Sequence, residues 1–298
     1  MSATERAELT SRVIPTMTLS KASSPLTAPH PANTSCSPAA RAQARFQISG
    51  NAIVTGGAGD IGFVVCRALL EHGLDGLMIF DLDPLAAKTK IDTLQAEFPV
   101  AKIYFAKVNV TDAEEVKTSV EAAAEKLGSV DILLTFAGVA SCAHAAQVSV
   151  AEWRRVLDIN TTGSFLCAQA ARNAMAAGGK GGSIVFCASI SGHAVNFPQP
   201  QAAYNASKAA VIAMTKSLAA EWARDGVRVN SISPGYMDTI LNEGDGLDVA
   251  RKIWNERHPM GRMGVPEEVV GAVVLLASRA GRYMTGADLL VDGGQTLF

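Results

Sequence analysis

Tyr204 and Lys208 form a pair that could move a proton, within the segment QPQAAYNASKAAV at residues 199–211. They are four residues apart, so a helix would place both on one face, with the phenol and the ammonium group side by side. A neighbouring cation stabilises the phenolate form of a tyrosine, which makes the phenol a usable proton acceptor. The same spacing also occurs on ordinary solvated helices, so its meaning depends on the rest of the chain.

A glycine-rich segment, TGGAGDIG, spans residues 55–62 directly after an apolar stretch. Glycines let the backbone turn sharply and approach a dinucleotide pyrophosphate, whose charge then lies at the N-terminus of the following helix. The alternative interpretation is a turn that only packs a helix tightly on a strand.

An acidic residue, Asp81, ends the next apolar stretch at residues 76–81, about 20 positions after the glycines, where dinucleotide-binding folds place a carboxylate for the ribose hydroxyls. That carboxylate would repel the 2′-phosphate of NADP, and Asp60 adds a second negative charge inside the loop, which holds no Lys or Arg. The sequence therefore predicts NAD as the cofactor and NADP as the less favoured alternative.

These groups need a frame of strands and helices to bring them together. Apolar or β-branched stretches alternate with helical patterns from residue 51 onward, and we expect strands at residues 52–56, 76–81, 102–109, 130–138, 182–189, 227–235 and 287–294. Helical periodicity is clear at residues 61–71, 148–177 and 203–223. This alternation predicts a doubly wound parallel α/β sheet, the Rossmann fold, in a single domain over residues 47–298.

Residues 1–46 differ in composition and are rich in Ala, Ser, Thr and Pro, so we expect a flexible, disordered N-terminal extension. Its basic residues leave mitochondrial targeting as an alternative to the cytoplasmic location that we expect. No apolar run approaches the roughly 20 residues that cross a bilayer, so the sequence predicts a soluble protein with no membrane partner.

Charge and cysteine usage exclude other classes. A net charge of −2 and a pI near 6.2 show no excess of Lys and Arg, which argues against nucleic acid as a partner. The five cysteines are odd in number and widely spaced, so neither a disulfide framework nor a metal site is expected.

Further motifs follow one another in a recognisable order. They are TFAG at residues 135–138, DINTTGSF around Asn160, VFCASISG around Ser189, SPGYMDT at residues 233–239 and VDGG at residues 291–294. With TGGAGDIG and YNASK, they make the chain similar to the short-chain dehydrogenases/reductases from residue 52 to the C-terminus. The roughly 250 residues after the extension match the shorter branch of that family.

The resemblance implies four catalytic residues. Tyr204 would be the acid or base, Ser189 would donate a hydrogen bond to the substrate oxygen, Lys208 would hold the nicotinamide ribose, and Asn160 would hold a water that links Lys208 to solvent. The implied and predicted cofactor-binding residues are Gly56, Gly57, Gly59, Asp60, Ile61, Gly62, Asp81, Asn109, Val110, Ala137, Gly138, Tyr204, Lys208, Pro234, Gly235 and Thr239.

Three departures from the family pattern involve four residues. Asp60 stands where a glycine is usual, and Thr135 and Phe136 replace two asparagines. Asn109 stands where many members have an aspartate that contacts the adenine amino group, a bond that an amide oxygen can still accept. These departures concern cofactor affinity and leave the proton and hydride transfer untouched.

The substrate is less well defined by the sequence. The PQPQAAYNASK run resembles fungal enzymes that interconvert polyols and ketoses, such as mannitol, arabinitol or xylulose enzymes, and His193, Asn196, Gln199 and Trp254 could contact hydroxyl groups. An NADP(H)-dependent ketose reductase, an NAD-linked hydroxyacyl or hydroxysteroid dehydrogenase and a non-catalytic dinucleotide sensor stay open as alternatives. Small and apolar residues on more than one face of the helices at 149–177 and 203–223, with the resemblance, predict a homodimer or homotetramer.

Overall fold

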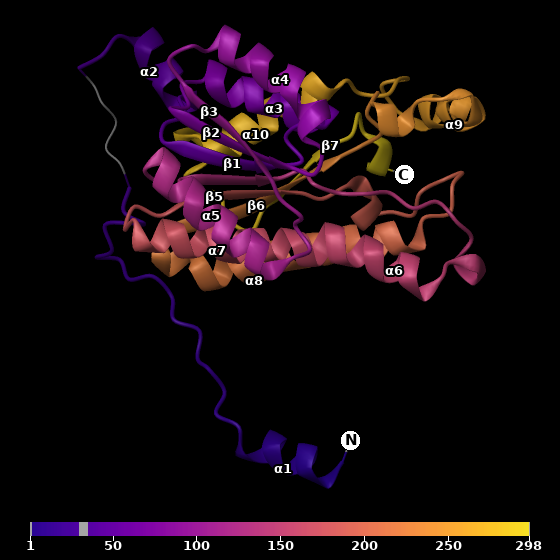
Figure 1. Ribbon diagram of the computed structural model, residues 1–298, viewed down its shortest axis with the longest axis horizontal. Helices are drawn as coiled ribbons and strands as arrows, with labels where there is room; N and C mark the ends of the chain where they lie inside the picture. The colour runs from indigo at the N-terminus through magenta and orange to yellow at the C-terminus, as the bar shows by residue number, and fades with distance from the viewer. Residues whose placement is uncertain (1, 30–34, 298) are drawn as a thin grey trace.

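Seven parallel strands form the centre of the protein in the computed structural model, which describes residues 2–29 and 35–297 (Figure 1). Their order is β3-β2-β1-β4-β5-β6-β7. The bounds are β1 Asn51–Thr55, β2 Gly76–Asp81, β3 Lys102–Lys107, β4 Ile132–Thr135, β5 Gly182–Cys187, β6 Val227–Pro234 and β7 Asp288–Val291. All seven predicted strands are confirmed, and so is the doubly wound sheet.

Helices cover both faces of this sheet (Figure 1). One face carries α3 (Asp60–Glu71), α4 (Pro84–Glu97) and α10 (Val270–Ala277), and the other carries α5 (Ala113–Leu127), α7 (Gly163–Ala177) and α8 (Ala202–Trp222). Two further helices, α6 (Val150–Leu157) and α9 (Asp248–Arg257), lie toward the end of the molecule where the strands finish.

Successive strand residues supply two separate apolar cores, because side chains in a strand alternate between the two faces of a sheet. Ile53 and Leu133 belong to the core under α5, α7 and α8, whereas their neighbours Val54 and Leu134 belong to the core under α3 and α10. Strands buried on both faces are mostly apolar, and β1, β4 and β5 show this pattern.

The chain reverses its direction of travel across the sheet between β1 and β4, which are neighbours. In an open parallel sheet, ligands bind at such a switch point, in the crevice outside the carboxyl ends of the strands. The glycine-rich loop follows β1 at this point, and Asp81 ends β2 beside it. The fold therefore brings the glycine loop and Asp81 together at the carboxyl ends of the strands.

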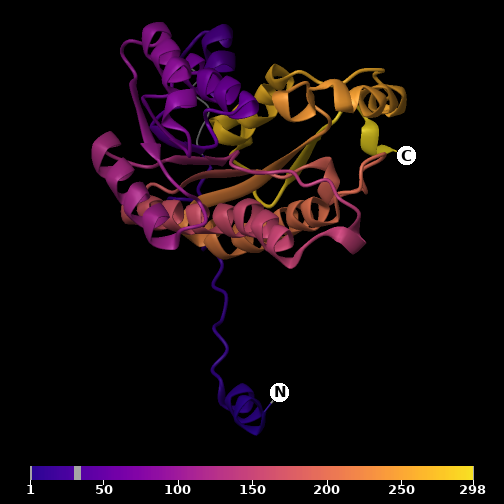
Figure 2. The ribbon, with the colours of Figure 1, turned by 45° about the vertical axis from the view of Figure 1, so that its right-hand side comes forward.

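The N-terminal extension contains two helices among its described residues, α1 (Ala3–Ser11) and α2 (Pro38–Phe46). Figures 1 and 2 show α1 projecting far from the sheet. Neither helix is expected from the composition of the extension. Helix α2 has Ser37 as its N-cap and Pro38 at its first position, two features that favour a helix start.

The extension also touches the body of the protein, because Leu26 packs against Gly226. Residues 30–34 of the extension lie outside the described residues, and its flexibility and its boundary at residue 46 stay predictions. Within the described ranges, no helix combines the length and apolarity needed to cross a membrane.

Candidate active site

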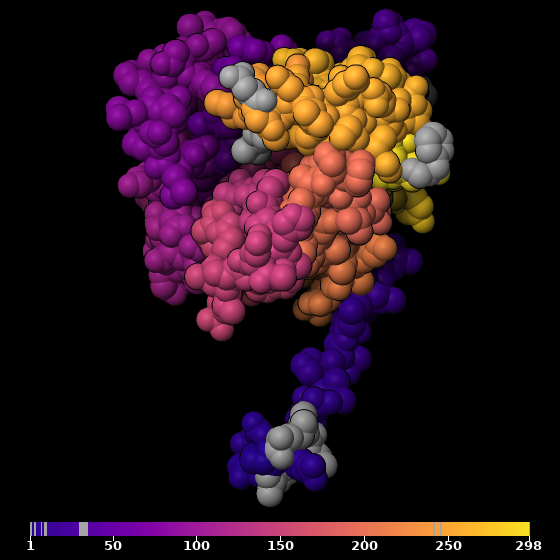
Figure 3. Space-filling view, turned by 90° about the vertical axis from the view of Figure 1, so that its right-hand side faces the viewer, coloured from indigo at the N-terminus to yellow at the C-terminus, as the bar shows by residue number. Residues whose placement is uncertain are grey.

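A cleft of about 1100 Å³ lies at the carboxyl edge of the sheet. Figure 3 shows the surface hollowed where the purple, pink and gold parts of the chain meet. Thirteen of the predicted cofactor-binding residues line the cleft, namely Gly56, Gly59, Asp60, Ile61, Gly62, Asp81, Asn109, Val110, Ala137, Gly138, Tyr204, Lys208 and Thr239. Gly57, Pro234 and Gly235 do not line it: Gly57 lies in the turn after β1, Pro234 ends β6, and Gly235 follows it.

The glycine loop has no room for side chains at two positions. A Cβ on Gly56, whose φ is +65°, would lie 2.5 Å from the Ala137 backbone nitrogen, and one on Gly62 would lie 2.2 Å from the Gly56 oxygen. Helix α3 begins directly after Gly59 and has no side-chain cap on its first backbone N–H groups. Uncapped N–H groups beside a bare backbone fit the pyrophosphate of a dinucleotide.

Asp81 is held in place by two backbone N–H groups. Its Oδ2 accepts from Ala58 at 3.1 Å and its Oδ1 accepts from Leu82 at 2.8 Å. A carboxylate offers about four lone-pair positions, so both oxygens keep capacity for ribose hydroxyls. The carboxylate is thus oriented before any ligand binds.

Asp60 does more than add negative charge to the loop. Its Oδ2 accepts the Ile240 N–H at 2.9 Å, which ties the glycine loop to the segment after Thr239. Its Oδ1 lies 3.6 Å from Nζ of Lys90 in α4. The loop itself has no basic residue, as the sequence indicated, but the fold brings one beside it.

The hydrogen bonds of Asn109 and Thr135 show what two other departures from the family pattern change. Asn109 Oδ1 accepts from Thr111 N at 3.1 Å and from Thr111 Oγ1 at 2.9 Å, so the predicted adenine acceptor already has two donors. Among the described residues, the buried Thr135 Oγ1 has no hydrogen-bond partner. The tie that an asparagine would make at that position is therefore missing.

Tyr204 and Lys208 both line the cleft from the first turns of α8. The Lys208 Nζ lies 5.6 Å from the centroid of the Tyr204 ring and donates to the Cys187 carbonyl oxygen at 2.7 Å. Since Lys208 is only 6% exposed, its ammonium group is fixed at the floor of the cleft.

Asn160 is buried in a π-helical segment, Asp158–Thr162, between α6 and α7. Its amide accepts from Val139 N at 2.8 Å and donates to Val139 O at 2.9 Å and to Ser207 Oγ at 3.0 Å. The side chain thus joins the loop after β4 to α8. Single π-turns often mark functional positions in helices, and the helical periodicity of residues 148–177 gives no sign of this one.

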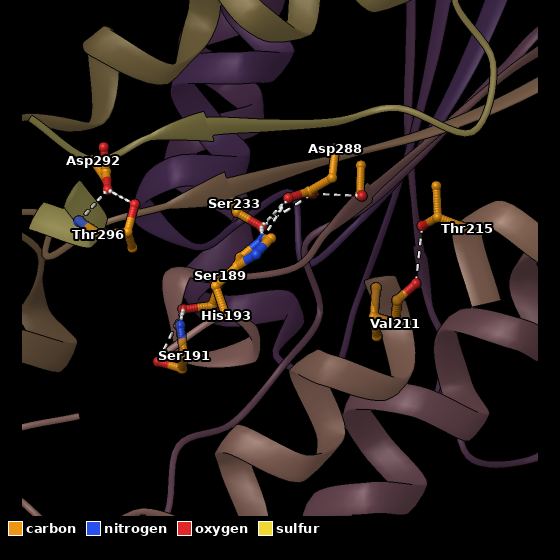
Figure 4. Close-up of polar contacts among 10 residues, drawn as sticks. Ser189, Ser191, His193, Val211, Thr215, Ser233, Asp288, Asp292 and Thr296 are labelled. Atoms are coloured by element: carbon orange, nitrogen blue, oxygen red, sulfur yellow. Dashed lines mark hydrogen bonds and ion pairs between the residues drawn. The ribbon is translucent and has the colours of Figure 1, made fainter. Parts of the chain in front are cut away.

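Ser189 follows β5 and begins a short turn, Ile190–Gly192, that packs directly on α8. The Ser189 Oγ accepts from Ser191 N at 3.1 Å and lies 3.1 Å from Ser191 Oγ (Figure 4). A Cβ on Gly192 would lie 2.8 Å from the Lys208 carbonyl carbon. The turn therefore brings Ser189 close to the helix that carries Tyr204 and Lys208.

His193 fastens the same turn to the edge of the sheet. Its Nε2 lies 2.7 Å from Asp288 Oδ2, and Ser231 and Ser233 donate to the same carboxylate (Figure 4). The structure therefore gives the His193 imidazole a partner in β7.

The remaining predicted substrate residues converge on Tyr236, which is not among the predicted site residues. Asn196 Nδ2 and Gln199 Nε2 each donate to the Tyr236 hydroxyl oxygen at 2.9 Å, and Trp254 Nε1 donates to Gln199 Oε1 at 3.1 Å. The Tyr236 and Trp254 rings stack with centroids 4.2 Å apart. Burial raises the pKa of Tyr236, so its phenol stays protonated and polar.

Comparison with known proteins identifies the family to which this site belongs. A family model described as "Enoyl-(Acyl carrier protein) reductase" matches residues 56–296. The chain belongs to the short-chain dehydrogenases/reductases. The match runs from the glycine loop to the turn after β7, so the family covers the whole cleft.

Among similar proteins is a probable NADP-dependent mannitol dehydrogenase of Yarrowia lipolytica, 40% identical over 84% of this chain and 89% of that protein. A sorbose reductase of Candida albicans is 38% identical over 84% of this chain and 89% of that protein. A solved structure of a gluconate 5-dehydrogenase from Burkholderia cenocepacia, in complex with NADP and tartrate, has 32% identity and a TM-score of 0.80, over 86% of this chain and 99% of that one.

As a short-chain dehydrogenase/reductase, the chain carries the expected tyrosine and lysine in the cleft, and the expected serine lies on a turn that packs on the same helix α8. Three supporting residues were not predicted from the sequence. Lys90, Tyr236 and Asp288 are distant in sequence from the motifs that they support. A signal existed for Tyr236, because it follows the Pro234-Gly235 turn directly. For Lys90 and Asp288 no motif was available.

Proposed function

We propose that the protein is an NAD(H)-dependent oxidoreductase that interconverts a sugar alcohol and its ketose. The observation that carries the proposal is that Tyr204 and Lys208 line the same cleft as the glycine loop and Asp81. The relatives named for mannitol and sorbose support a polyhydroxy substrate.

The proposed chemistry divides among the residues of the cleft. A nicotinamide dinucleotide, when bound, accepts a hydride in oxidation and returns it in reduction. Tyr204 takes the hydroxyl proton during oxidation and returns it during reduction. Lys208 keeps a positive charge beside the phenol, from a position fixed by the Cys187 carbonyl.

Ser189 acts on the substrate oxygen. Its Oγ accepts the Ser191 N–H, and its own hydrogen can rotate from Ser191 Oγ to the oxygen on which negative charge develops. Asn160 fixes the backbone at Val139 and, through Ser207, the helix that carries the pair, so it positions the reacting groups.

A polar wall near the reacting groups supports a hydroxylated substrate. Asn196, Gln199 and Tyr236 bring two amides and a phenol together on the loop after the Ser189 turn and at the end of β6. The buried Asn196 Oδ1 has no hydrogen-bond partner among the described residues, so it could accept from a substrate hydroxyl; a hydroxysteroid or a long acyl chain would leave it unpaired, at a cost of about 1–3 kcal/mol.

The preference for NAD rests on Asp81 and Asp60, two carboxylates at the part of the cleft where the ribose would bind. The Yarrowia relative is named as NADP-dependent, so the preference needs its own test.

Initial rates with NAD and NADP over mannitol, sorbitol, arabinitol and xylitol, beside a 3-hydroxyacyl thioester and a hydroxysteroid, test the proposal. We expect turnover of at least one polyol, with kcat/KM for NAD at least roughly tenfold above that for NADP. Turnover of the acyl or steroid substrate alone would contradict the substrate class. Binding of NADH without turnover of any compound would favour a sensor.

We also infer a homodimer or homotetramer. Helix α6 leaves Val150 65% exposed and Trp153 39% exposed. A partner subunit would cover such apolar side chains. Light scattering coupled to size exclusion gives the mass, and a monomeric mass at micromolar concentration would refute this inference.

A further inference from the structure

Lys90 is a basic residue of α4 whose ammonium group contacts Ala58 and Asp60, two residues that line the cleft. It lies one helical turn after Ala86, which lines the cleft, and residues four apart share a helix face. Its Nζ donates to the Ala58 carbonyl oxygen at 2.7 Å and lies 3.6 Å from Asp60 Oδ1.

Ala58 connects this ammonium group with Asp81. The Ala58 carbonyl accepts from Lys90, whereas the Ala58 N–H donates to Asp81 Oδ2 at 3.1 Å. A cation and a carboxylate therefore hold the two sides of one residue in the glycine loop. Any group that meets the Asp81 carboxylate in the cleft also lies within the field of the Lys90 ammonium.

The Lys90 ammonium retains capacity for another ligand. An ammonium group has three N–H donors, and among the described residues one hydrogen bond, to Ala58, is formed. The contact with Asp60 is an ion pair at 3.6 Å, longer than a hydrogen bond, and the Lys90 side chain is 32% exposed.

The neighbouring Arg67 does not have this freedom. Arg67 and Lys90 both lie over the Phe63 ring, but the Arg67 guanidinium makes two hydrogen bonds to Glu97, at 2.9 and 3.1 Å. Its charge is neutralised in a bidentate pair. Lys90, in contrast, retains N–H donors that can bind an anion beside the loop.

We propose that Lys90 forms a binding subsite for the 2′-phosphate of NADP, an inference that rests on the dinucleotide cleft of the proposed function. Asp81 opposes a 2′-phosphate and Lys90 attracts it, so their balance sets the ratio of NAD to NADP use. The enzyme then accepts NADP as a weaker second cofactor, although its glycine loop contains no basic residue.

Binding of adenosine 2′,5′-bisphosphate and of adenosine 5′-monophosphate tests the subsite, because the two probes differ only in the 2′-phosphate. Each dissociation constant is measured by calorimetry on the full-length protein, for the native chain, Lys90→Met, Lys90→Arg and the control Lys88→Met. Lys88 is on the same helix but forms an exposed pair with Asp92 at 2.8 Å.

We expect Lys90→Met to weaken the bisphosphate roughly fivefold to tenfold, the size of one charge-assisted contact at a partly exposed site, and to change the monophosphate less than twofold. Lys90→Arg keeps the charge and should retain most of the bisphosphate affinity, and Lys88→Met should match the native protein. The bisphosphate affinity of Lys90→Met should also depend less on salt.

Equal weakening of both probes in Lys90→Met would overturn the proposal, because it would make Lys90 only a support of the loop. Unchanged bisphosphate binding in that variant would overturn it as well. Failure of the native protein to bind either probe would instead refute the dinucleotide cleft on which the proposed function depends.

Discussion

Substituting Gly192 with Ala should displace the Ser189 turn from helix α8. A Cβ at this position would lie 2.7 Å from Ile212 Cδ1, 2.8 Å from the Lys208 carbonyl carbon and 2.9 Å from the Ala209 nitrogen. The isoleucine can rotate, but the helix backbone cannot, so turn and helix must separate by about half an ångström to reach ordinary contact near 3.4 Å.

A shift of that size should affect catalysis more than folding. Overpacking of this kind costs about 1–3 kcal/mol, while misplacing reacting groups by about 1 Å can cost on the order of 100-fold in rate. We therefore expect Gly192→Ala to lower kcat for a polyol roughly 10- to 100-fold, with the dissociation constant of NADH nearly unchanged because the turn does not line the dinucleotide cleft.

The assay combines steady-state kinetics with NADH fluorescence titration and thermal unfolding. Gly271→Ala in α10 is the matched control, because a Cβ there meets no atom of the described residues within 4 Å. Full activity of Gly192→Ala would show that the distance between the Ser189 turn and α8 does not matter for the reaction, and the assignment of Ser189 would then be wrong.

Three further outcomes follow from the same structure. His193→Ala should lower kcat roughly tenfold, because the turn after β5 loses its bond to Asp288, and should leave the NADH affinity unchanged. His193→Gln should recover part of the rate, since its amide can donate to Asp288. Equal rates in the two variants would refute a positioning role. Glu268, bound by an arginine and a backbone N–H, has a pKa lowered from 4.5 to about 2. The pKa is lower in the folded than in the unfolded protein, so this carboxylate stabilises the fold above about pH 4.5 and loses that effect as the pH falls toward 2. In denaturant titrations over this pH range, the unfolding free energy of Glu268→Gln should drop less than that of the native protein. An identical drop would contradict the prediction. Burial raises the pKa of Cys167 to about 12, so a thiol reagent at pH 8 should label the exposed Cys142 in the native protein and Cys167 only after unfolding, as peptide mass mapping would show.

Local sequence patterns predicted the frame of the molecule well. Buried parallel strands need continuous apolar residues, so β1, β4 and β5 were visible in the sequence, and the turn residues of the glycine loop fixed where the first crossover begins. Tyr204 and Lys208 could be placed on one face of α8 because helical spacing alone determines that relation. Their position in the cleft with the glycine loop then followed from the topology of the sheet.

The partners of individual side chains could not be read in the same way. The proximity of Lys90 to the glycine loop depends on how α4 packs beside α3, and the bond between His193 and Asp288 joins residues 95 positions apart. The π-turn at Asn160 adds one residue to a helix whose apolar periodicity otherwise looks continuous. Such contacts are set by tertiary packing, which leaves no periodic signal in the chain.

The central claim is that the Tyr204 phenol transfers the proton in a cleft that also binds a nicotinamide dinucleotide. Its most direct test is the rate of polyol oxidation by Tyr204→Phe, measured together with the NADH dissociation constant of the same variant. We expect kcat to fall by about 100- to 10,000-fold with NADH binding within twofold to threefold of the native protein. A phenylalanine variant that keeps more than a tenth of the native rate would contradict the account.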